Sequence, residues 1–230
     1  MSSAGAALVA ADPRVWRDGV RTRVRAWSAI RQATDETCVA SFAARIIMPA
    51  RCLAGPGDAQ PLVDSVNQTG SPSALWTALL QTMAWLDITR TADTRESIVA
   101  ITDRMVSANF YGLEDVICRA TSRGISVYPI MALPRLWAQA EGPAKERAAA
   151  LLRTLASETG GIFQRCDRPS RTDVCDGRGG SLDVLLAKAA EDLRSTVIVE
   201  LREPVSDTRI RQLIVRIQGR STPLEIRRVR

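Results

Sequence analysis

The sequence predicts an α/β fold with a mainly parallel sheet, because apolar runs of strand length alternate with segments of helical periodicity. The run from Ile98 to Ile101 is rich in β-branched residues and lacks polar alternation, as in a parallel strand covered on both faces. A helical pattern from Tyr111 to Gly124 follows, and then an apolar run from Ser126 to Met131. This order is a βαβ unit. Thr102 and Asp103 come at the carboxyl end of its first strand, where open α/β sheets bind ligands.

The rest of the chain continues this alternation. Residues 4–11 form a short apolar run that ends before Asp12, and a helix begins near Ser73. A helix over residues 148–157 is ended by Gly160 and Gly161, and another begins after Ser181. The expected buried positions are Leu75, Leu79, Met83 and Leu86 in the helix after Ser73, and Leu182, Leu185, Ala189 and Leu193 in the helix after Ser181.

The carboxyl-terminal part of the chain carries most of the net charge of +6. From Arg194 to Arg230 there are nine Arg residues against four acidic ones, and residues 195–201 and 210–217 have strand patterns that predict an antiparallel pair. Arg-rich strands either face water or bind a polyanion such as nucleic acid. We therefore expect an α/β domain over residues 1–193 and a β extension over residues 194–230 that packs on the same domain.

Several kinds of chemistry are excluded by composition. The chain has no His, which removes Ser-His-Asp and Cys-His catalysis, and it has neither a P-loop nor a dinucleotide-binding Gly motif. We therefore expect a protein that is not an enzyme. The five Cys include no CxxC pair, so zinc is not expected. Cys38 and Cys118 lie in apolar patterns and are expected to be core residues, whereas Cys166 and Cys175 bracket a polar loop and would pair only in an oxidising compartment.

The order of these segments resembles the von Willebrand factor type A domain, and in particular a bacterial subgroup of that family. The resemblance implies a three-layer, Rossmann-like α/β/α fold with a mainly parallel sheet and, here, a carboxyl-terminal antiparallel β extension. No single motif carries it, but the order and spacing of five segments do. These are Thr37 to Ala43 and Arg45 to Pro49 as the second and third strands, Gly70 to Leu79 as a Gly-to-helix turn, Gly124 to Ile130 as a strand, and Leu151 to Phe163 as the last helix and strand.

The resemblance also implies a metal-ion-dependent adhesion site at the carboxyl edge of the sheet. Asp103 matches the family's last Asp and Ser73 its Thr, so these two are the candidate metal ligands. Asp12 stands at the first-strand position, but residues 13–16 supply none of the usual Ser ligands, and Arg104 replaces a Gly. The Arg104 guanidinium either takes over part of the metal's charge or faces water. We expect a degenerate site with no cofactor, or at most weak Mg²⁺ binding.

These observations predict a non-catalytic, protein-binding module of the adhesion or scaffold type. Its partner would bind at Asp12, Ser73, Asp103 and Arg104. The alternative is a module that binds nucleic acid or another polyanion through the Arg-rich carboxyl-terminal strands. No apolar run is long enough to span a membrane. As the sequence stands we expect a cytoplasmic protein with Cys166 and Cys175 reduced, or an exported or periplasmic one if an upstream signal segment is missing.

Overall fold

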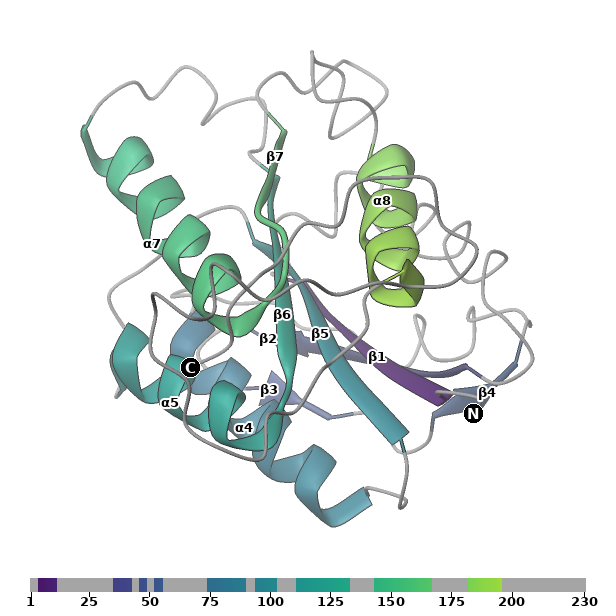
Figure 1. Cartoon of the computed structure of the whole chain (residues 1–230). Coiled ribbons are helices and arrows are strands. Elements are labelled where there is room, and N and C mark those ends of the chain that lie inside the picture. The colour runs from purple at the N-terminus through teal and green to yellow at the C-terminus, as the bar shows by residue number, and fades with distance from the viewer. Residues whose placement is uncertain are drawn as a thin grey trace, which may run out of the picture.

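The computed structural model of the chain is described for residues 4–11, 35–42, 46–48, 52–55, 74–89, 94–102, 111–132, 143–166 and 182–195. The described strands form one seven-stranded sheet in the order β3-β2-β1-β5-β6-β7, with β4 also paired to β2 (Figure 1). The strands are β1 (Ala4–Ala11), β2 (Glu36–Phe42), β3 (Ile46–Ile47), β4 (Leu53–Ala54), β5 (Thr94–Thr102), β6 (Ser126–Ala132) and β7 (Gln164–Cys166). The helices are α4 (Leu75–Thr89), α5 (Leu113–Arg123), α7 (Pro143–Thr159) and α8 (Leu182–Ser195).

The centre of the sheet is parallel, as the sequence predicts. β1, β2, β5, β6 and β7 run in the same direction, and β5 lies between β1 and β6. The apolar run from Ile98 to Ile101 is fully buried there. A strand covered on both faces has no solvent side, which is why its sequence lacks polar alternation.

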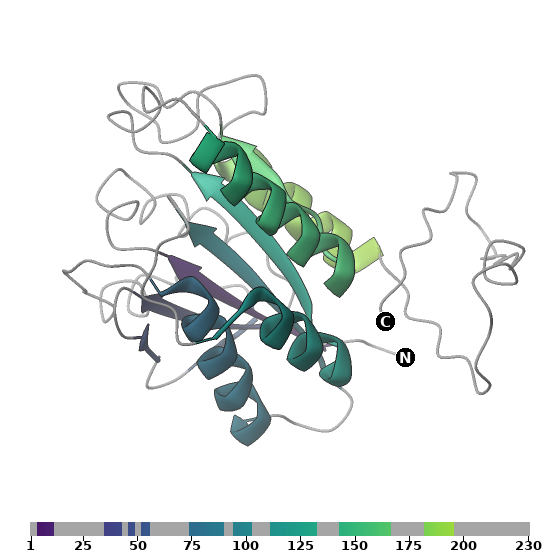
Figure 2. The ribbon, with the colours of Figure 1, turned by 90° about the vertical axis from the view of Figure 1, so that its left-hand side faces the viewer.

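Helices cover both faces of the sheet. The face that we call the three-helix face packs against α4, α5 and α7, and it presents Phe42, Ile98 and Val127 to the main apolar core. The opposite face, the α8 face, presents Tyr128 and Gln164, whose side chains bond to α8. Successive strand residues point to opposite faces, so Val127 and Tyr128 belong to different layers. Figures 1 and 2 show α7 and α8 separated by the sheet. The predicted α/β/α arrangement is therefore confirmed.

Two consecutive crossovers lie on the same face. The chain passes from β5 through α5 to β6, and from β6 through α7 to β7, moving one place along the sheet each time. Right-handed crossovers in the same direction must place their helices on the same side. α5 and α7 accordingly share the three-helix face.

Helix ends explain where these crossovers turn. Gly124 has φ of 66° after α5, and the Ile125 amide donates to the Ala120 carbonyl at 2.9 Å. This left-handed cap is the role that the sequence assigns to Gly124. After α7, a Cβ on Gly161 would come within 1.9 Å of the Val127 carbonyl oxygen, so only Gly fits between the helix and β6. α7 itself begins at Pro143, earlier than predicted, because Pro suits the first helical position.

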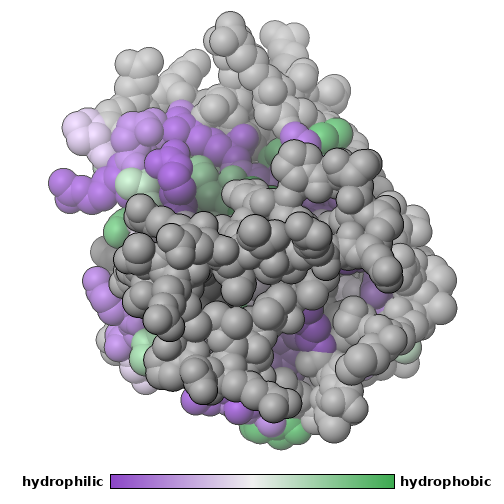
Figure 3. Space-filling model, in the orientation of Figure 1, coloured by the Kyte–Doolittle hydropathy of each residue, from purple (hydrophilic) through white to green (hydrophobic). Residues whose placement is uncertain are grey.

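The predicted buried positions of α4 are confirmed. Leu75, Leu79, Met83 and Leu86 are each at most 2% exposed. In α8, Leu185 and Ala189 are buried and Leu193 is half-buried. Figure 3 shows a mainly hydrophilic surface over α7, which has its apolar residues turned toward the sheet. None of the described helices is long and apolar enough to cross a membrane.

Cys38 is buried in the core, as predicted, but it is joined to Cys52 by a disulfide that the sequence analysis did not expect. β3 and β4 both pair antiparallel with β2, with Ser41 opposite Ile47 and Thr37 opposite Leu53. In the register of β4, Cys52 falls opposite Cys38, and their Cα atoms are 4.4 Å apart. This separation is typical of a non-hydrogen-bonded antiparallel pair.

The expectation that Cys118 is a core residue is wrong. Cys118 lies on α5 as an exposed free thiol, not in the core. α5 packs on the core through Leu113, Val116, Ile117 and Ala120, and Cys118 falls on the opposite, exposed side of the helix. Cys175, the polar loop after Cys166 and the extension beyond Ser195 lie outside the described residues. α8 ends at Ser195, two residues past the boundary expected at residue 193.

Candidate functional site

The carboxyl edge of the sheet is where the sequence places the candidate site. In the parallel register, Ala11 at the end of β1 lies beside Ser41 of β2 and Ile101 of β5. Three neighbouring strands therefore end at one edge, and Figure 2 shows their arrowheads on the same side. The chain leaves β1 and β5 next to each other, which is the geometry that open α/β sheets use for binding.

The four candidate residues, Asp12, Ser73, Asp103 and Arg104, lie outside the described residues. Each of them adjoins a described element: Asp12 follows β1, Ser73 precedes α4 by two residues, and Asp103 and Arg104 follow β5. The structure thus places the elements that carry these residues, and the roles of the four side chains stay predictions.

The start of α4 belongs to the same edge. α4 ends at Thr89, shortly before β5 begins at Thr94 on the opposite edge, and at about 1.5 Å per residue the helix is long enough to span the sheet. Its first turn therefore lies toward the carboxyl edge. The Ala74 carbonyl accepts the Ala78 amide at 2.9 Å, so Ala74 holds the position expected for Ser73 as N-cap.

Two hydroxyl side chains lie at this edge: Thr102, which the sequence already placed there beside Asp103, and Ser41, which the sequence analysis did not single out. Ser41 is 2% exposed, and its Oγ has no hydrogen-bond partner within the part of the chain that the structure describes. Thr102 is completely buried at the end of β5. A buried hydroxyl left unpaired costs roughly 1 to 3 kcal/mol, so Ser41 marks the edge as suited to a polar ligand or water. A Ser or Thr in the last two positions of a strand is the sequence signal that indicated Thr102 and could have indicated Ser41.

Across the described ranges, there is no group of three or more Cys, Asp and Glu residues placed to hold a metal ion. The predicted ligands Ser73 and Asp103 lie outside those ranges, so this finding does not test the prediction of at most weak Mg²⁺ binding.

Comparison with known proteins defines the fold. No protein-family model matches the sequence, and no curated protein matches it. Solved structures do match. BatB from Bacteroides thetaiotaomicron aligns with a TM-score of 0.57 at 13% identity, over 83% of this chain and 99% of that one.

A von Willebrand factor type A protein from Catenulispora acidiphila aligns with a TM-score of 0.54 at 12% identity, over 84% of this chain and 43% of that one. The proximal thread matrix protein 1 of the mussel byssus, with a zinc-occupied MIDAS motif, aligns with a TM-score of 0.57 at 12% identity, over 82% and 46%. The chain therefore has a von Willebrand factor type A-like fold, as the resemblance in sequence implied. At these identities the likeness establishes the fold alone.

Proposed function

We propose that this chain is a non-catalytic, protein-binding module of the von Willebrand A kind, and that its partner binds at the carboxyl edge of the sheet. The observation that carries the proposal is the register that sets Ala11 beside Ile101, because it brings the exits of β1 and β5 together. Asp12, Asp103 and Arg104 follow these exits directly in the sequence. Proteins with this fold commonly bind other proteins, which supports the same assignment.

The proposed site does not depend on a metal. The chain keeps two of the family's oxygen ligands, Ser73 and Asp103, and lacks the two Ser that complete an octahedral sphere. Arg104, next to Asp103, offers a fixed positive charge and several donors for a partner's carboxylate. A carboxylate that would otherwise bind the metal can bind this guanidinium.

A capture experiment with matched variants tests the binding mode. The tagged protein is incubated with lysate from its native source, and retained protein and nucleic acid are quantified at about 50 and 200 mM salt. We expect one protein partner that is lost with Asp103→Ala and Arg104→Ala and retained with Glu114→Ala, which removes an exposed acid on α5. Capture of nucleic acid, with affinity that falls steeply as salt rises, would support the Arg-rich strands as the binding surface instead.

A thermal shift experiment tests the metal. A ligand at a hundredfold excess over Kd stabilises the native state by about 2.7 kcal/mol, which shifts Tm by roughly 5 to 10 °C in a chain of this size. We expect millimolar Mg²⁺ or Mn²⁺ to leave Tm unchanged relative to chelator. A rise of several degrees that Asp103→Ala abolishes would show a working metal site.

We further propose that the module acts in an oxidising compartment, in contrast to the cytoplasmic location that the sequence by itself suggested. The Cys38–Cys52 disulfide supports this, because disulfides persist outside the reducing cytosol. Mass spectrometry of alkylated protein from its native source should recover the two cysteines in one linked peptide. Recovery of both as alkylated free thiols would contradict the proposal.

A further inference from the structure

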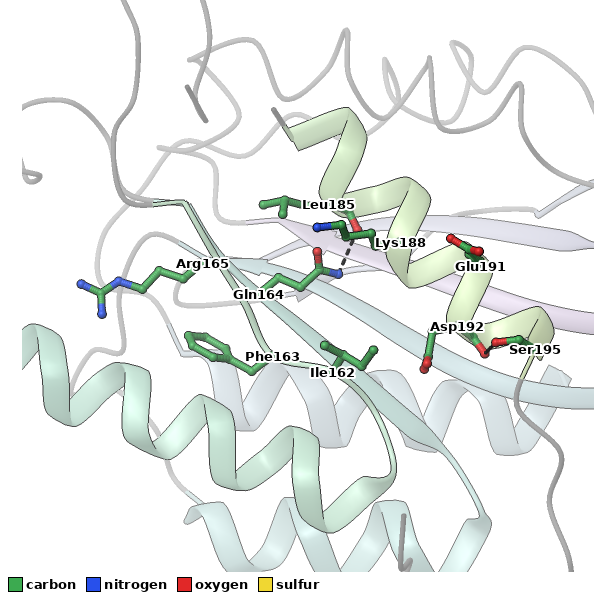
Figure 4. Close-up of a pocket in the computed structure, with 9 residues that line it drawn as sticks. All are labelled: Ile162, Phe163, Gln164, Arg165, Leu185, Lys188, Glu191, Asp192 and Ser195. Atoms are coloured by element: carbon green, nitrogen blue, oxygen red, sulfur yellow. Dashed lines mark hydrogen bonds between the residues drawn. The ribbon is translucent and has the colours of Figure 1, made fainter. Parts of the chain in front are cut away.

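A groove of about 470 Å³ lies between β7 and α8, and none of its lining residues belongs to the carboxyl-edge proposal. Figure 4 shows the side chains around it. β7 and the turn before it contribute Phe163 and Arg165, which contact α7 on the three-helix face, and also Gln164, which bonds to α8 on the opposite face. Residues from both faces of β7 line the groove, and the two faces of a strand meet only at its edge. The groove therefore follows the outer edge of β7.

Gln164 has an unpaired acceptor in this groove. Its side chain is 7% exposed, and Nε2 donates to the Leu185 carbonyl at 2.9 Å. Oε1 has no hydrogen-bond partner among the described residues. A buried carbonyl without a donor is rare in folded proteins and needs an explanation. A ligand that supplies an N–H group would satisfy it.

The edge of β7 favours an extended chain as that ligand. Within the described residues, β7 pairs only with β6, in parallel register with Ile130 opposite Gln164. The backbone on the other side of β7 faces the groove, and an open strand edge presents N–H and C=O groups that pair with an added strand. Ile162 and Leu185 provide apolar surface for the side chains of such a strand.

The charges around the groove favour a basic ligand. Arg165 is paired with Glu146 at 3.0 Å, and this guanidinium holds the pKa of the Glu146 carboxyl below its ordinary value. Asp192, at the groove, accepts the Tyr128 hydroxyl at 2.9 Å. With Arg165 neutralised, the lining contains the carboxylates of Glu191 and Asp192 against the ammonium of Lys188. Glu191 is exposed, so its carboxylate is the one that a basic side chain of a ligand can reach.

We propose that the groove between β7 and α8 binds an extended peptide that carries a basic side chain. The peptide lies along the outer edge of β7, one of its N–H groups donates to Gln164 Oε1, and its basic side chain lies near Glu191. This is a second protein-binding surface, independent of the one at the carboxyl edge, because the two share no residue.

A peptide library displayed on phage tests the proposal on the full chain. Peptides are selected on the wild-type protein after depletion on the Glu191→Lys variant, and the recovered sequences are synthesised and their Kd values measured. We expect a shared Lys or Arg flanked by β-branched residues. Glu191→Lys should weaken binding by about tenfold or more, and Gln164→Leu should also weaken it, whereas Asp103→Ala should leave Kd unchanged.

Two controls make a negative result decisive. Glu191 is exposed, so its reversal should not affect folding, and Glu114→Lys on α5 makes the same charge change away from the groove. Methylation of alternate peptide nitrogens removes the donors that strand addition needs, and it should abolish binding. The proposal is overturned if no selected peptide distinguishes wild type from Glu191→Lys, or if methylated peptides bind as well as the parents. Failure of the carboxyl-edge proposal would instead appear as capture that is insensitive to Asp103→Ala.

Discussion

The two faces of the sheet are built from alternating residues of the same strands, yet they differ in chemistry. On the three-helix face, β2 and β5 present Phe42 and Ile98 to an apolar core. On the α8 face, the same sheet buries a series of polar side chains, namely Thr37, Ser41, Ser97, Ser126 and Gln164. Thr37 Oγ1, Ser41 Oγ and Gln164 Oε1 have no hydrogen-bond partner within the described ranges.

This difference separates stability from binding. Apolar burial contributes roughly 25 cal/mol per Å², so large side chains such as Phe42 and Ile98 stabilise the domain when they are buried. Buried hydroxyls and amides contribute little net energy, and they cost energy when unpaired. We expect the unpaired groups of the α8 face to contribute to binding a polar partner more than to stability. Substitutions on neighbouring residues that point to opposite faces can test this division.

The largest effect is expected from Phe42→Ala. Phe42 is completely buried on the three-helix face, and its truncation should lower the free energy of unfolding by about 3 to 5 kcal/mol. At roughly 2 to 4 °C per kcal/mol, Tm should fall by at least about 6 °C in a calorimetric or circular dichroism melt. Ile88→Ala, at a side chain 84% exposed on α4, is the control and should change stability by less than about 0.5 kcal/mol. Equal losses for the two variants would refute the assignment of the core.

Removal of the disulfide should have the next largest effect. Cys38 and Cys52 are 14 residues apart in sequence, and a crosslink of that length stabilises by about 3 kcal/mol through the unfolded chain. Cys52→Ser should lose this amount in urea unfolding without reductant. Cys118→Ser, which replaces an exposed free thiol, should leave stability unchanged. If both variants unfold at the same urea concentration as wild type, the crosslink does not form in solution.

Ser41→Ala should have the opposite sign to Phe42→Ala, although the two residues are adjacent. It removes an unpaired hydroxyl from the α8 face, so stability should stay constant or rise by up to about 1 kcal/mol. The readout is the free energy of unfolding from urea titration. A loss of more than about 1 kcal/mol would mean that the Ser41 hydroxyl makes a hydrogen bond in the folded protein, for example to an ordered water.

The smallest effect concerns Glu146 and Arg165 at the rim of the groove. Arg165 lowers the pKa of the Glu146 carboxyl from its ordinary value of 4.5. Folding thus favours the ionised form, and the stabilisation is present above pH 4.5 and lost as the pH falls through the lower, folded pKa. Glu146→Gln should therefore be slightly less stable than wild type at pH 7 and equal to it near pH 3. A difference that persists unchanged at pH 3 would assign the effect to packing and not to charge.

Much of the fold was accessible from the sequence because its signals are local. The apolar run at Ile98, the helix ended by Gly124 and the paired Gly160 and Gly161 each act within a few residues. For the candidate site, the sequence predicted only where its residues lie along the chain. The sequence places Asp103 after a strand, and the register beside β1 comes from the assembled sheet.

The sequence by itself determined the alternation of strands and helices, and hence the parallel sheet, because burial on both faces imposes continuous apolar runs. Tertiary structure decided which residues meet. The Cys38–Cys52 pair depends on the register of β4, a strand of two residues, which has no periodicity to detect. Cys118 faces solvent because α5 packs on the core through the opposite side of the helix, where Val116 and Ala120 are buried. No signal in the sequence marks Gln164, because its half-satisfied amide arises only from the packing of α8 against β7.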